Sequence, residues 1–170
     1  TGTVGSPDNG DVITCTTVGG DQTATVGDNG AGVAANVTLE DGAAIDTADE
    51  AVNIGNTTVT LGAGSNITST AGSFVVGSRK YTGTSSATVN LSGDNSYISA
   101  VGAGIDGIAL YDLSANNNTV TVTLSGDNTQ VSTTGSTGFG IYGGQNGAGS
   151  NNINVTPVSY THLRAHETSP

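Results

Sequence analysis

The chain has few large side chains. Phe, Tyr and Trp make up only 4% of its 170 residues, and Trp and Met are absent. A globular core of ordinary thickness is filled by such side chains, so this composition argues against one. Val, Ile, Leu and Ala remain to fill the interior, and they predict a thin core.

Positive charge and cysteine are also scarce. Lys and Arg number 3 against 14 Asp and Glu, which gives a formal net charge of −11. An acidic surface repels phosphate backbones, so we expect no nucleic-acid partner. A single cysteine, Cys15, excludes an internal disulfide framework, and we interpret it as a small buried hydrophobe. No apolar run reaches the length of a membrane-spanning helix.

The last residues differ in character from the rest of the chain. Both histidines, His162 and His166, lie here. The segment VSYTHLRAHET, Val158 to Thr168, resembles an in-frame translation of the transposase adapter used to prepare shotgun sequencing libraries. We therefore expect residues 158–170 to be a scar of cloning or assembly in a metagenomic fragment, and the natural protein to continue beyond Pro157. A His-x-x-x-His metal site on one helix face is the competing interpretation.

The rest of the chain contains an internal repeat. Residues 89–99 read VNLSGDNSYIS and residues 122–132 read VTLSGDNTQVS, at an offset of 33 residues. Shorter versions of the unit start at Val37-Thr38-Leu39 and Val59-Thr60-Leu61, and Ile13-Thr14-Cys15 starts the first one less clearly. Each unit alternates aliphatic and hydroxyl side chains in short segments, which is typical of half-buried strands, and closes in Asn and Gly clusters.

Three short strands in every 22 to 33 residues predict an all-β fold, a right-handed parallel β-helix (β-solenoid) of roughly five coils. We expect residues 1–157 to form this single domain. Equivalent asparagines at the corners should form amide ladders. Equivalent leucines should form one buried stack, made of Leu39, Leu61, Leu91 and Leu124. A β-sandwich is the alternative, because hairpin signals such as Asp28-Asn29-Gly30 are present, and low-complexity disorder is another.

Asp94 and Asp127 occupy equivalent positions in two repeats and are the carboxylates most readily brought together. A catalytic pair or a cation site is one interpretation; we favour a turn-forming Gly-Asp-Asn corner whose side chains bond the local backbone. Before the tail the only basic residues are Arg79 and Lys80, few for a carbohydrate-active β-helix enzyme. We therefore expect no catalytic, cofactor-binding or metal-binding residues and no cofactor.

Aromatic side chains in the repeats are the remaining candidates for binding. Tyr97, Tyr111 and Tyr142, together with Asp94 and Asp127, could contact a sugar or a partner surface. The competing interpretation is that such rings fill wide corners of the solenoid. Outward threonines suggest an ice-binding face, but unequal coil lengths and a poor register of threonines between coils count against it.

Three stretches carry a family resemblance: Gly10 to Thr16 (GDVITCT), the VTLSGDN units, and Gly138 to Gly143 (GFGIYG). Together they resemble the passenger region of bacterial autotransporters. The resemblance implies a right-handed β-helix, a translocator β-barrel in the full-length protein and a cleaved signal peptide before Thr1.

The same resemblance implies a secreted, non-catalytic structural or adhesin-like segment displayed at the outer membrane of a bacterial cell. Its ligand would lie on a host surface, a glycan or a neighbouring cell. A carbohydrate-active β-helix enzyme fragment and an ice- or sugar-binding solenoid are the alternatives.

Overall fold

The computed structural model describes residues 7–18, 20–27, 33–80, 84–112, 117–145 and 150–157. Every strand in these ranges runs parallel to its neighbours, and the ranges contain no helix, so none that could cross a membrane. The predicted all-β parallel β-helix is confirmed. The β-sandwich is excluded, because it requires antiparallel pairing. The predicted non-native tail, 158–170, lies outside the described residues, as does Asp28-Asn29-Gly30.

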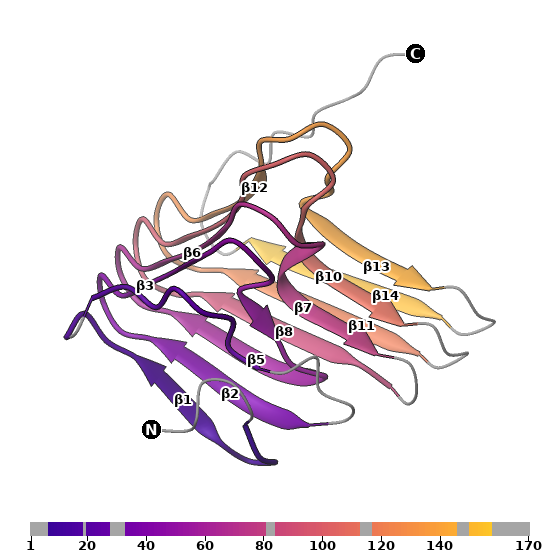
Figure 1. The fold of residues 1–170 in the computed structure, drawn as a ribbon, viewed down its shortest axis with the longest axis horizontal. Helices are drawn as coiled ribbons and strands as arrows, with labels where there is room; N and C mark the ends of the chain where they lie inside the picture. Colours follow the sequence, from indigo (N-terminus) through magenta and orange to yellow (C-terminus); the bar gives the residue numbers. More distant parts are fainter. Residues whose placement is uncertain are drawn as a thin grey trace.

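The described residues form 14 strands in three sheets, whose strands lie side by side in Figure 1. Sheet A contains β1 (Val12–Cys15), β2 (Ala34–Leu39), β5 (Asn56–Leu61), β8 (Ser86–Leu91), β11 (Asn118–Leu124) and β14 (Asn151–Pro157). Sheet B contains β3 (Ala44–Thr47), β6 (Asn66–Ser69), β9 (Tyr97–Ala100) and β12 (Gln130–Thr133). Sheet C contains β4 (Val52–Asn53), β7 (Phe74–Lys80), β10 (Asp106–Asp112) and β13 (Ile141–Gln145).

Each coil passes through sheets A, B and C in that order. Strands β2, β3 and β4 form the second coil, and three further coils repeat the pattern up to β13. The first coil continues past β1 through two isolated parallel bridges, from Gln22 to Ile45 and from Val26 to Val52. Strand β14 opens a sixth turn, so the prediction of roughly five coils is confirmed.

The predicted leucine stack is present in sheet A. The parallel register pairs Leu61 with Leu39 and with Leu91. Leu91 pairs in turn with Leu124, and all four side chains are buried. Cys15 extends the stack below Leu39; it is half-buried, and burial raises the pKa of its thiol. Because burial of each aliphatic contributes about 1.5–3 kcal/mol, such stacks hold the coils together.

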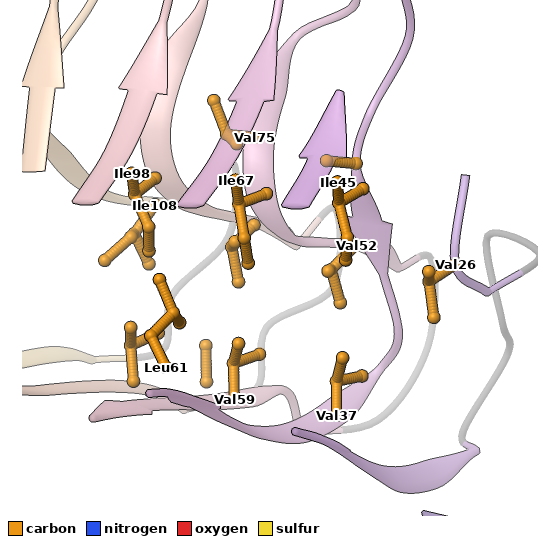
Figure 2. Packing of buried hydrophobic residues seen from close by; sticks show 14 of the residues in the cluster. Val26, Val37, Ile45, Val52, Val59, Leu61, Ile67, Val75, Ile98 and Ile108 are labelled. Atoms are coloured by element: carbon orange, nitrogen blue, oxygen red, sulfur yellow. The ribbon is translucent and has the colours of Figure 1, made fainter. Parts of the chain in front are cut away.

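The core between the sheets is thin, as the composition predicts. Figure 2 shows Val37 and Val59 of sheet A opposite a second row formed by Ile45, Ile67 and Ile98 of sheet B. The register places these isoleucines directly above one another, and all five side chains are fully buried. At these positions aliphatic side chains span the interior from both sides.

The corner between sheets A and B is built by the Ser-Gly-Asp-Asn motif. Asn95 and Asn128 adopt left-handed φ values of 58° and 56°, which asparagine tolerates. Asn128 Nδ2 donates a hydrogen bond to Asn95 Oδ1 at 3.2 Å, which confirms the predicted amide ladder. A Cβ atom at Gly93 would lie 2.0 Å from the backbone nitrogen of Ala63, so glycine lets neighbouring coils approach closely here.

Candidate functional site

The two aspartates predicted as a possible pair lie at this corner between sheets A and B. Asp94 Oδ1 accepts a hydrogen bond from the backbone N–H of Asp127 at 2.8 Å. Two coils earlier, Asp41 Oδ1 accepts the backbone N–H of Ala63, also at 2.8 Å. The corner interpretation expected bonds to the local turn, whereas these carboxylates bond the backbone of the next coil. Asp94 thereby stabilises the stacking of coils.

The three tyrosines that the sequence offers as binding candidates lie on two different sheets. Tyr97 lies on the outer face of sheet B, where its register neighbours are Asn66 and Gln130. Tyr111 and Tyr142 meet on the outer face of sheet C, with ring centroids 5.3 Å apart. Only this second group brings aromatic side chains from different coils into contact.

Two phenylalanines extend the tyrosine pair across three successive coils. Phe74 lies 5.9 Å from Tyr111, between ring centroids, and Phe139 stacks on Tyr142 at 5.4 Å with an interplanar angle of 16°. Phe74 is fully buried, Tyr111 and Tyr142 are half-buried, and Phe139 is 58% exposed. These four side chains, named here the aromatic row, belong to β7 (Phe74), β10 (Tyr111), β13 (Tyr142) and the segment just before β13 (Phe139). The three strands lie side by side in Figure 1. Phe139 is therefore the end of the row that a ligand can reach.

Asp106 holds two members of the row in place. Its carboxylate is 3% exposed, Oδ1 accepts the backbone N–H of Phe139 at 2.8 Å, and Oδ2 accepts the hydroxyl of Tyr111. Burial, reinforced by this hydrogen bond, raises the pKa of Tyr111 above its ordinary value. One buried carboxylate therefore fixes the ring of Tyr111 and ties the segment before β13 to the coil below.

A basic side chain and two carboxylates flank the buried end of the row. The guanidinium carbon of Arg79 lies 5.9 Å from the Tyr111 ring centroid, within cation–π range. Its Nη2 lies 3.8 Å from Glu50 Oε1 and donates to the hydroxyl of Ser73. Asp49 precedes Glu50 and accepts that residue's backbone N–H at 2.9 Å. Arg79 thus pairs with one carboxylate, that of Glu50, despite the scarcity of basic residues.

The pKa values of the two carboxylates are shifted in opposite directions. Burial raises the pKa of Glu50, while hydrogen bonding to Glu50 lowers the pKa of Asp49. Opposed shifts of this kind occur in acid–base pairs of enzymes. Glu50 Oε1 also accepts the backbone N–H of Ser73 at 3.2 Å, so the same carboxylate supports the corner between sheets B and C.

The outer face of sheet A carries hydroxyl and amide side chains in register. One column contains Thr14, Thr38, Thr60, Asn90, Thr123 and Thr156. The next contains Asn36, Thr58, Thr88, Thr121 and Asn154 and begins at the exposed, apolar Val12; the third contains Asn56, Ser86, Thr119 and Asn152 and begins at Ala34. We call this surface the hydroxyl face. The expectation of a poor threonine register is wrong, because the extra residues of the longer coils lie outside sheet A.

The sequence reasoning did not single out Asp106, Glu50 or Phe74. Asp106 could have been found, because the repeat offset of 33 residues places Phe139 directly above it. Glu50 and Arg79 share no such relation, since they belong to coils of different length. Among the described residues, no group of three or more His, Cys, Asp or Glu is placed to hold a metal ion.

Comparison of the chain with protein-family models, with curated proteins and with solved structures gave no match. The functional assignment therefore rests on the geometry of the two surfaces and on the sequence motifs.

Proposed function

We propose that the chain is a non-catalytic, adhesin-like segment of a surface-displayed β-solenoid, and that its aromatic row binds a neutral glycan. The observation that carries the proposal is the stacked pair of the exposed Phe139 and the half-buried Tyr142 on one lateral face, backed by Tyr111. Sugar rings present C–H groups that pack on the electron-rich face of an aromatic ring. The ring centroids follow one another at 5.9, 5.3 and 5.4 Å along the row. Such a series of rings suits a ligand made of consecutive sugar units.

The resemblance to autotransporter passengers supports the cellular setting of this proposal. In that setting the chain is secreted and displayed at the outer membrane through a translocator β-barrel of the full-length protein. Its binding partner is then a glycan on a host surface or on a neighbouring cell.

Charge favours a neutral ligand over an acidic one. The chain carries a net charge of −11, which repels anionic polymers. Arg79, the cation beside the row, lies 3.8 Å from Glu50, so its charge is largely compensated. Selection of the ligand then depends on ring stacking and on hydrogen bonds at the edge of the row.

A glycan array probed with the full chain tests the proposal, followed by titration with the strongest ligand. We expect neutral oligosaccharides to bind, and Tyr142→Ala or Phe139→Ala to weaken binding several-fold to about tenfold, since an aromatic contact contributes about 0.5–1.5 kcal/mol. The matched control is Tyr97→Ala on sheet B, which should bind like the unmodified chain. Absence of any glycan ligand, or equal losses in all three variants, would contradict the proposal.

A carbohydrate-active enzyme is the second candidate, favoured by the ion pair of Arg79 with Glu50. In this role Glu50, with its raised pKa, would act as the general acid. Incubation of the bound oligosaccharide with the chain decides between the two. An unchanged oligosaccharide supports the adhesin; shortened products that disappear with Glu50→Gln would establish the enzyme instead.

A further inference from the structure

The hydroxyl face is most regular over its three central strands. Each of β5, β8 and β11 contributes three outward side chains, which are Asn56, Thr58, Thr60, Ser86, Thr88, Asn90, Thr119, Thr121 and Thr123. All are half-buried by their neighbours. Threonine is stiff at χ1, so a half-buried threonine holds its hydroxyl and methyl groups in a nearly fixed position. The surface is therefore an ordered array.

This array carries no charge. None of the outward positions of β2, β5, β8, β11 and β14 is Asp, Glu, Lys or Arg, although the chain has 14 acidic residues. The other two sheets differ: sheet B exposes Asp46, and the outer side of sheet C carries Arg79. A charged group orients the water molecules around itself. Because this face has no charged groups, the water on it can be ordered by the hydroxyl groups instead.

The spacing of the array is fixed in two directions by parallel strand geometry. Neighbouring strands lie about 4.8 Å apart, and outward residues along one strand lie about 6.6 Å apart. These two repeats are close to oxygen–oxygen repeats on the faces of an ice crystal. A hydroxyl can both donate to and accept from water, as each site of the ice lattice requires. The array therefore has the chemistry and the two-dimensional period of an ice surface.

We infer that the hydroxyl face binds ice, through water molecules ordered by the threonines around Thr88. This activity is separate from the glycan site, because the aromatic row lies on sheet C. The region of contact is centred on β5, β8 and β11. Toward β2 the array is interrupted by Ala34 and by a hollow whose lining includes three of its own members, Asn56, Thr58 and Ser86.

The experiment measures thermal hysteresis and inhibition of ice recrystallisation by the full chain. Thr88→Lys places a long charged side chain at the centre of the array and should remove most of both activities. Thr68→Lys is the matched control: Thr68 is also a half-buried outward threonine of a parallel strand, but it lies on sheet B. It should retain the activity of the unmodified chain. Thermal unfolding followed by circular dichroism shows whether both variants remain folded.

Three results would overturn the inference. The first is an unmodified chain that neither lowers the freezing point beyond the colligative effect nor slows recrystallisation. The second is an equal loss in folded Thr88→Lys and Thr68→Lys. The third is binding of the unmodified chain to insoluble crystalline polysaccharide, without an effect on ice, that is lost in Thr88→Lys and kept in Tyr142→Ala; it would assign the face to a solid carbohydrate instead. Each of these results leaves the glycan proposal unaffected, because Tyr142 and Phe139 are unchanged in Thr88→Lys and Thr68→Lys.

Discussion

At the scale of the residue, equivalent Asp and Asn side chains connect one coil to the next. Asp94 accepts the backbone N–H of Asp127, and Asn118 Nδ2 donates to Asn151 Oδ1, in each case across 33 residues. Local turn rules assign Asp and Asn to the backbone a few positions away, so they miss these partners. The repeat period supplies them, because stacking places each residue next to its equivalent one coil later.

Tyr111 gives the clearest pH-dependent prediction. Its pKa is raised above the ordinary 10.0 in the folded chain, so the fold retains this proton better than the unfolded chain does. The resulting stabilisation is complete below about pH 10 and is lost as the pH rises through the folded pKa. The free energy of unfolding, measured by urea titration at several pH values, should therefore fall above pH 10 less steeply for Tyr111→Phe than for the unmodified chain.

At neutral pH the same substitution removes the donor to Asp106. Because that carboxylate is 3% exposed, Tyr111→Phe should cost about 1–3 kcal/mol of stability there. Equal slopes above pH 10 for the two proteins would contradict the proposed burial of the Tyr111 hydroxyl.

At the scale of the element, each interior strand is stabilised by the strands before and after it in the same sheet. In sheet A, β8 lies between β5 and β11, whereas β14 pairs with β11 alone among the described strands. The side chains show the difference: Leu91 in β8 is fully buried, while Ile153 and Val155 in β14 are 45% and 37% exposed. Stability should therefore be higher inside the stack than at β14.

Substitutions along sheet A test this difference. Leu91→Ala removes a side chain packed between Leu61 and Leu124 and should lower the free energy of unfolding by about 2–5 kcal/mol. Val155→Ala, in β14, should lower it by about 1 kcal/mol or less. Chemical unfolding followed by circular dichroism measures both values. Similar losses in the two variants would show that the coils do not stack as described.

The residue patterns within the strands also show which features of the fold and of the candidate site could be predicted from the sequence. Alternation of aliphatic and hydroxyl residues, with the repeat offset, predicted the strands of sheet A and the stack of Leu61 and Leu91. The aromatic row could not be predicted in the same way. In sheet C the register pairs Tyr111 with Gly144 and Tyr142 with Ala109, so the two tyrosines meet diagonally and not as repeat equivalents.

At the scale of the whole molecule, the solenoid separates its surfaces by sheet. Sheet A presents the hydroxyl face, sheet C presents the aromatic row, and the corners between sheets hold the ladders that fix the register. Because each surface grows by one strand per coil, its length depends on the number of coils while its chemistry depends on the outward residues alone. Such a scaffold can carry two independent binding activities.

The central claim, a glycan bound on the aromatic row, is tested most directly by NMR of the aromatic side chains. With 5 Tyr and 2 Phe in the chain, the ring signals can be assigned individually. On addition of a saturating neutral oligosaccharide, the ring resonances of Phe139 and Tyr142 should shift, while those of Tyr97 on sheet B should stay in place. Shifts confined to Tyr97, or no aromatic shift with a ligand that binds, would contradict the account.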